Sequence, residues 1–246
     1  MKLEISELTG LDIPVDALRR AERLAGGYLE TELVLREHGV QHTIVVFGGT
    51  RIPDSERVSN PRAKDYYQIA REFGAIVGRA GQGPDDCSLT LTTGGGPGIM
   101  EAANRGASEV GAKSIGLNIR LPHEQLPNRF ISDELSFNFQ YFAIRKLHFL
   151  IRAKALVAFP GGFGTLDELF ETLNLVQCRR IKPLPVILVG EKFWRRAVDI
   201  EFLAKAGLID PEDRLLFSYA ETAQQIWDDI VDWYARADKP LLCDDA

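Results

Sequence analysis

The stretch 155-ALVAFPGGFGTLDELF-170 joins a short apolar run to a helical pattern through a proline, three glycines and a threonine. The unbroken apolar run at 155–159 predicts a strand of a parallel sheet that is covered on both faces. The apolar spacing over 165–179 predicts a helix. Glycine lets a ligand approach the backbone closely, and the first N–H groups of a helix carry partial positive charge without partners. The turn between the two elements therefore predicts a site for an anion such as phosphate.

The same alternation of apolar runs and helical patterns extends along the chain. Strands are predicted at 43–47, 88–93, 113–119, 155–159, 185–189 and 214–219. Helices are predicted at 14–38, 61–79, 99–110, 138–153, 165–179, 191–206 and 221–236, with a loop at 120–137. This order predicts an α/β fold with a doubly wound parallel sheet, helices on both faces and an extra N-terminal helix.

Two further glycine clusters follow predicted strands in the same way. They are Gly48-Gly49-Thr50 and Gly94-Gly95-Gly96-Pro97-Gly98. One such loop needs no explanation beyond tight turning, but three at one edge of a sheet favour a shared ligand cleft. The P-loop pattern is absent, and Ile99 and Asp167 stand where GxGxxG would need glycine. A mononucleotide or a sugar phosphate therefore fits better than a dinucleotide.

The sequence allows two interpretations of Glu168. Thr165-Leu166-Asp167-Glu168 fits a capping box, in which Glu168 only binds the backbone in the first turn of the helix. Alternatively, Glu168 lies at sugar distance from a bound phosphate, where it binds ribose hydroxyls, stabilises an oxocarbenium ion or activates water. The core face of this helix is predicted to be Leu166, Leu169, Phe170 and Leu173.

The helix predicted at 138–153 has an apolar and a polar stripe. The apolar stripe consists of Phe139, Phe142, Ala143, Leu147, Leu150 and Ile151. The polar stripe consists of Asn138, Tyr141, Arg145, His148 and Arg152. A polar stripe is usually a solvated face, so His148 and Arg152 are expected in water.

The composition limits the kind of partner. The net charge of −6 and the pI near 5.4 argue against a nucleic-acid surface, although a local anion site is compatible with both. Three cysteines without metal-like spacing indicate a cytoplasmic protein with reduced thiols. No secretory leader, membrane span or metal cluster is expected.

Three stretches of the chain resemble the LOG (Lonely Guy) family. The stretch 160-PGGFGTLDE-168 is similar to its PGGxGTxxE motif, and 94-GGGPGIMEAANRGA-107 to its second glycine-rich motif. The stretch 144-IRKLHFLIRAKALVAFPGG-162 resembles the Arg-Lys helix that leads into the same strand. The resemblance spans roughly residues 42–235.

The resemblance implies a Rossmann-like homodimer that hydrolyses the N-glycosidic bond of AMP or N6-modified AMP, without metal or cofactor. By motif, Arg145 and Glu168 would be catalytic. The implied nucleotide-binding set is Gly161, Gly162, Gly164, Thr165, Gly94, Gly95, Gly96, Gly98, Gly48, Gly49, Thr50, Met100 and Lys146. A carrier or sensor that binds a nucleotide without hydrolysis stays open as the alternative, and a DNA-processing protein is disfavoured by the acidic charge.

Two departures from short family members bear on the substrate. About forty extra residues precede the first predicted strand, and 136-SFNFQYFAIRK-146 replaces the family's Met-His-Glu-Arg-Lys type of sequence at the expected base pocket. The family resemblance therefore predicts the phosphate and ribose chemistry of this protein better than its base preference. The expected organisation is an N-terminal extension at 1–40, a Rossmann-like domain at 41–237 and a tail at 238–246.

Overall fold

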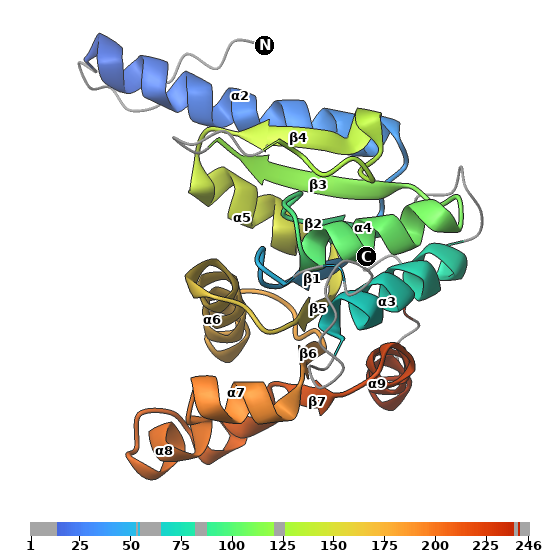
Figure 1. Cartoon of the computed structure of the whole chain (residues 1–246). Helices are drawn as coiled ribbons and strands as arrows, with labels where there is room; N and C mark the ends of the chain where they lie inside the picture. The colour runs from blue at the N-terminus through green and yellow to red at the C-terminus, as the bar shows by residue number, and fades with distance from the viewer. Residues whose placement is uncertain are drawn as a thin grey trace.

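A computed structural model describes residues 14–52, 54, 65–81, 88–120, 126–238 and 241. Seven parallel strands form one sheet in the order β4-β3-β2-β1-β5-β6-β7 (Figure 1). The strands are β1 (His42–Phe47), β2 (Leu89–Thr93), β3 (Ser114–Ile119), β4 (Ser136–Phe139), β5 (Ala153–Ala158), β6 (Val186–Val189) and β7 (Ser218–Ala220). The predicted α/β, Rossmann-like class is confirmed.

Helices cover both faces of this sheet. They are α2 (Val15–Glu37), α3 (Tyr66–Ala80), α4 (Ile99–Glu109), α5 (Phe142–Ile151), α6 (Phe163–Gln177), α7 (Glu191–Ala197), α8 (Ile200–Lys205) and α9 (Ala223–Arg236). Short 3-10 helices lie at η2 (Asp133–Leu135) and η3 (Pro211–Leu215). One apolar core joins the sheet to α3, α4 and α9, and a second joins the other face to α2, α5, α6 and α7.

The order of the strands places the glycine clusters together. The central strand β1 has six buried residues and pairs with β2 on one side and β5 on the other. Val46 is level with Thr93 of β2 and with Val157 of β5, so these three strands end at the same edge. The strand order reverses here, and such switch points bind ligands in open α/β sheets. The three clusters therefore follow strands that end at one edge of the sheet, as predicted.

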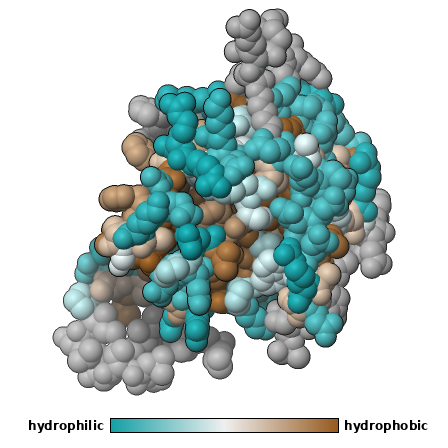
Figure 2. Space-filling model, turned by 90° about the horizontal axis from the view of Figure 1, so that it is seen from below, coloured by the Kyte–Doolittle hydropathy of each residue, from teal (hydrophilic) through white to brown (hydrophobic). Residues whose placement is uncertain are grey.

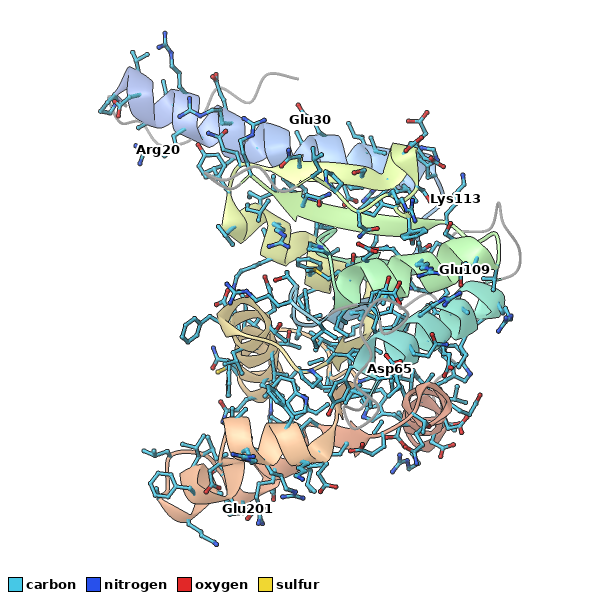
Figure 3. All side chains as sticks on the ribbon, viewed as in Figure 1. Arg20, Glu30, Asp65, Glu109, Lys113 and Glu201 are labelled. Atoms are coloured by element: carbon cyan, nitrogen blue, oxygen red, sulfur yellow. The ribbon has the colours of Figure 1, made fainter. Side chains whose placement is uncertain are left out.

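Glycine lets α3 and α4 cross closely on one face of the sheet. A Cβ added at Gly106 of α4 would collide with the carbonyl oxygen of Arg71 in α3, and one at Gly74 would collide with that of Ala103. At the margin of this contact, Glu109, which is labelled in Figure 3, accepts hydrogen bonds from the Arg71 guanidinium at 2.7 and 2.8 Å.

We expect Gly106→Ala to lower the free energy of unfolding by about 3 kcal/mol, because the atoms of α3 that the added Cβ would meet are backbone atoms that cannot rotate away. The matched control is Gly26→Ala in α2, where an added Cβ meets nothing within 4 Å. That change should raise stability by about 0.5–1 kcal/mol through helix propensity. Denaturant titration checks both, and a loss below about 1 kcal/mol for Gly106→Ala would contradict the close crossing.

The structure corrects three predicted elements. Residues 136–139 form the edge strand β4, paired with β3, so the helix predicted from 138 begins only at Phe142. The helix predicted at 191–206 is two helices, because Val198 is extended and the Asp199 side chain caps α8. In place of a strand from 214, η3 runs to Leu215 and β7 starts at Ser218. Part of the helix predicted at 61–79 and most of the expected tail lie outside the described residues.

The two stripes of α5 also face opposite to expectation. His148 is 2 % exposed and stacks on Tyr28 of α2, and the Arg152 guanidinium pairs with Glu32 of α2 at 2.9 Å. The predicted apolar stripe instead leaves Phe142, Leu147 and Ile151 about half exposed. The physical reason is that α2 supplies aromatic and acidic partners that bring the polar stripe inside.

Apolar side chains are also exposed at the end of the molecule formed by α8 and η3. They are Phe202, Leu208 and Leu215. The view from below shows hydrophobic atoms toward the middle of the face among hydrophilic ones (Figure 2).

Candidate active site

A cleft of about 290 Å³ opens at the carboxyl ends of β1 and β5. The glycine turns after these strands, the start of α5 and the start of α6 form its walls. The lining residues are Phe47, Gly48, Gly49, Thr50, Met100, Phe142, Arg145, Gly162, Phe163, Gly164, Thr165, Asp167 and Glu168. Both predicted catalytic residues and the first and third glycine clusters are thus brought together.

The N-terminus of α6 faces this cleft without a side-chain cap. Gly162 is the N-cap residue, and no side chain accepts a hydrogen bond from the first amides. The capping-box interpretation of Thr165 and Glu168 is therefore wrong, because the helix starts at Phe163 and Thr165 is already its third residue. An added Cβ at Gly162 or Gly164 would meet nothing within 4 Å, so packing does not require glycine there. Uncapped amides beside open space suit an anion.

Glu168 lies in the second turn of α6 and is only 7 % exposed. At 1.5 Å per residue it is about 7.5 Å along the helix axis from the first residue, Phe163, which is roughly the span of a ribose phosphate. Burial raises the pKa of the Glu168 carboxyl to about 7, while the cations of Lys146 and Arg145 act in the opposite direction. A carboxyl with this pKa changes its charge near neutral pH, which suits acid–base or electrostatic catalysis.

The buried face of α6 differs from the predicted one. Its buried side chains are Thr165, Glu168, Leu169, Thr172 and Val176. Phe170 was predicted to be in the core but is 37 % exposed. Glu168 thus belongs to the inward face, which turns toward the cleft at this level of the helix.

Arg145 approaches the cleft from α5. Its Nε donates to the carbonyl oxygen of Leu117 at 2.7 Å, and its guanidinium lies 5.1 Å from the centroid of the Phe149 ring. Burial lowers the pKa of Arg145, while the charge of Glu168 raises it. A guanidinium nevertheless stays protonated in proteins. The cleft therefore holds a fixed cation and a titrating carboxyl.

The second glycine cluster supports the cleft from behind. Gly94, Gly95, Gly96 and Gly98 are buried and are not among the lining residues. At Gly94 a Cβ would meet Arg145 Nη2 and Met100 Sδ, and at Gly98, where φ is +71°, it would collide with the Gly49 carbonyl oxygen. This cluster therefore lets Arg145 and the first glycine turn come close.

A buried polar network holds the second glycine cluster in place. Asn128 Nδ2 donates to the carbonyl oxygens of Gly95 and Gly96 at 3.2 and 3.1 Å, and to Asn104 Oδ1 at 3.0 Å. Thr93 Oγ1 accepts from the Gly95 amide at 3.0 Å. The sequence reasoning did not single out either asparagine: Asn104 lies within the motif at 94–107, and Asn128 lies in the predicted loop with no local pattern to mark it.

Lys146 is placed differently from the other predicted residues. It does not line the cleft, and its ammonium lies 2.9 Å from Asp167 Oδ2 and 2.8 Å from Glu171 Oε2. Phe142, which lies in the segment expected at the base pocket, and Phe163, which sequence reasoning did not single out, do line it. Their positions next to the motifs were the available signal: Phe163 lies inside PGGFGT, and Phe142 is one turn before Arg145.

The described residues contain neither a metal-binding cluster nor a membrane-spanning helix. No group of three or more histidine, cysteine, aspartate or glutamate side chains is arranged to hold a metal ion in the described part of the chain. No helix in these same ranges is both long and apolar enough to cross a membrane.

Comparison with solved structures supports the fold. The X-ray structure of TM1055, a structural genomics target, matches with a TM-score of 0.53 and 20% identity over 78% of this chain and 99% of that chain. The molybdenum cofactor binding protein from the phototrophic bacterium Rippkaea orientalis matches with a TM-score of 0.51 and 19% identity over 81% of this chain and 98% of that one. At these identities the likeness shows the fold alone.

Comparison of sequences identifies the family. A rice protein (Oryza sativa subsp. japonica) named probable cytokinin riboside 5'-monophosphate phosphoribohydrolase LOGL5 is 28% identical over 175 residues, which is 68% of this chain and 66%, just under two thirds, of that protein. The Arabidopsis thaliana cytokinin riboside 5'-monophosphate phosphoribohydrolase LOG1 is 28% identical over 62% of this chain and 72% of its own. The family model described as "Possible lysine decarboxylase" matches residues 100–230, and the chain therefore belongs to this family, which includes the LOG proteins.

Proposed function

We propose that this protein is a nucleotide phosphoribohydrolase that hydrolyses the N-glycosidic bond of AMP or an N6-modified AMP. Water adds to C1′ of the ribose, and the bond from C1′ to the base breaks. The base leaves with the electron pair of that bond and gains a proton, and ribose 5-phosphate remains. The reaction requires no change of redox state.

One observation carries this proposal. Glu168 is buried in the cleft with a pKa of about 7, and its distance from the uncapped amides of α6 is roughly the length of a ribose phosphate. In the proposed complex, the 5′-phosphate binds at Gly162, Gly164 and Thr165, which places C1′ near Glu168. The Glu168 carboxylate then stabilises the positive charge that develops on the ribose or orients the attacking water. Named relatives with phosphoribohydrolase activity support the same reaction class.

The remaining cleft residues are assigned by position. Arg145 is fixed by Leu117 and Phe149 and offers positive charge to the phosphate or to the departing base. Phe142 and Phe163 offer aromatic faces on which a purine can stack. Gly48, Gly49, Thr50 and Met100 close the opposite wall.

The test is to incubate the purified protein with AMP, GMP, CMP, UMP and isopentenyl-AMP and to follow the free base by chromatography. Base release that disappears in Glu168→Gln is the expected result, and the ranking of substrates gives the base preference. The fold alone does not decide the question, because one solved neighbour is named as a cofactor binding protein. Binding of AMP without base release from any nucleotide would favour a carrier or sensor.

We further propose that the protein is a homodimer, as the family resemblance implies, and that it works in the cytoplasm. The outward face of α5, with Leu147 and Ile151, and the neighbouring Phe163 and Phe170 of α6 leave apolar surface beside the cleft. Apolar surface of this kind, next to a functional site, is typical of a protein interface.

Replacing both Leu147 and Ile151 by aspartate is expected to convert the dimer to a monomer, because charge placed in an apolar contact is not solvated there. Sedimentation analysis at about 10 μM protein measures the mass. The control is Leu33→Asp, which introduces a charge of the same kind at a side chain of α2 that is 62 % exposed and is not part of the proposed apolar surface. A monomeric parent protein, or a double variant that stays dimeric, would contradict this interface.

A further inference from the structure

The side chain of Lys146 connects the two helices that carry the candidate catalytic pair. Lys146 is in α5, and its Nζ lies 2.9 Å from Asp167 Oδ2 and 2.8 Å from Glu171 Oε2, both in α6. The Lys146 side chain is only 16 % exposed. Partial burial reduces the screening that makes most surface ion pairs weak.

The order of residues along the helices makes this contact informative. Lys146 directly follows Arg145, and Asp167 directly precedes Glu168, so the ion pair lies beside the catalytic pair. Successive residues of a helix point about 100° apart. The side chains of Arg145 and Glu168 therefore turn into the cleft, while Lys146 lies outside it and pairs with Asp167, which also lines the cleft.

Asp167 and Glu171 are four residues apart and share one side of α6, so a single ammonium reaches both. Two acceptors in α6 restrict the helix more strongly than one, since rotation of α6 about its axis would break one of the ion pairs. Glu168 is between these two residues in the sequence, so the rotation that the ion pairs oppose would move its carboxyl.

We propose that Lys146 is a positioning residue, which holds Glu168 opposite Arg145 by joining α5 to α6 through Asp167 and Glu171. This inference rests on the proposed function of Glu168. It assigns Lys146 a role outside the nucleotide contact that the family resemblance implies.

The charges around Glu168 predict pKa shifts of opposite direction for two substitutions. The cations facing Glu168 are Lys146 and Arg145 from α5, and the anions are Glu171 and Asp167 from its own helix. Burial, the largest effect, raises the pKa of Glu168; the cations lower this pKa and the anions raise it. Removing the Lys146 charge should therefore shift the pKa upward, and removing the Glu171 charge should shift it downward.

The experiment compares Lys146→Met, Lys146→Arg and Glu171→Gln in the full chain. The glutamate side chains are labelled with ¹³C at the carboxyl carbon and titrated by NMR. The Glu168 signal is assigned by its absence in Glu168→Gln. We expect the pKa of Glu168 to rise by about one unit in Lys146→Met, to fall in Glu171→Gln, and to return close to the parent value in Lys146→Arg. Thermal unfolding confirms that each variant is folded.

The rate profile supplies the functional readout. In Lys146→Met we expect kcat for AMP to fall about tenfold with little change in KM, because Glu168 is displaced while the phosphate site is intact. The pH at which kcat/KM inflects should shift in the same direction as the pKa of Glu168 measured from its carbon signal.

Unchanged titration of Glu168 in Lys146→Met and Glu171→Gln, or shifts of the same sign in both, would overturn the positioning role. The carbon titration does not require turnover. If the parent protein released no base from any nucleotide, the proposed hydrolysis would fail while the titration would still decide the role of Lys146.

Discussion

Replacing Glu168 by glutamine is expected to lower kcat for base release by about 10³-fold, because the amide can neither carry negative charge nor accept a proton. The substitution keeps the size of the side chain, so the affinity for AMP should stay within a few-fold of the parent value. Base release by chromatography and AMP binding by calorimetry measure the two effects separately. Turnover within tenfold of the parent protein would remove Glu168 from the mechanism.

The same variant has a pH-dependent effect on stability. Burial raises the pKa of the folded carboxyl to about 7 from its ordinary value of 4.5, so between these values the folded protein binds more protons than the unfolded chain. The free energy of unfolding therefore falls as pH rises from about 4.5 to 7, by up to about 3 kcal/mol. Glu168→Gln removes this fall in the free energy of unfolding, because the amide does not titrate. The thermal midpoint of the variant should exceed that of the parent at pH 8 and differ little at pH 4.5.

Arg145→Ala is expected to lower kcat/KM by about 10²–10³-fold, through loss of the fixed cation in the cleft. The change also removes a positive charge that lowers the pKa of Glu168, so that pKa should rise further and the acid limb of the rate profile should move to higher pH. Measurement of kcat/KM from pH 5 to pH 9 tests both effects.

The control for this prediction is Arg145→Lys, which keeps the charge. Lysine cannot reproduce the donor at the Leu117 carbonyl or the planar contact with Phe149, so only partial recovery is expected. Full recovery in Arg145→Lys would mean that charge alone is needed. Near-parent activity in Arg145→Ala would exclude a role for Arg145 in the reaction.

The predictions that held depended on local patterns with a direct physical cause. Glycine clusters after apolar runs predicted where strands end, and parallel strand order then brought two of these clusters to one cleft. The glycine turn made Glu168 a candidate, but spacing alone left it divided between a helix cap and a site residue, and the resemblance to the LOG family favoured the second; its catalytic role is a proposal. The second cluster was placed at the correct edge, but its contact with Arg145 is a tertiary feature that spacing does not encode.

The predictions that failed depended on contacts between distant segments. The polar stripe of α5 was expected in water, and it is buried because α2, more than a hundred residues earlier, provides Glu32 and Tyr28. The alternation in 136-SFNF-139 was a strand signal, but the helical pattern that follows it obscured the boundary. The capping-box interpretation of Glu168 is excluded for a local reason, since the helix begins two residues before the motif threonine.

The uneven anchoring of α2 has a consequence for motion. Its buried residues, Thr31, Glu32 and Leu35, all lie in the last two turns, and Gly26 and Gly27 weaken the middle of the helix. Most helical stability in proteins comes from tertiary packing, so the first turns, which bury no residue, depend largely on propagation from the anchored end. Local unfolding therefore starts at Val15 and proceeds toward Thr31. α2 contributes no residue to the cleft, and Glu32 at its anchored end pairs with Arg152 at the end of α5, so fraying that stops before Thr31 leaves this contact with the helix of Arg145 in place.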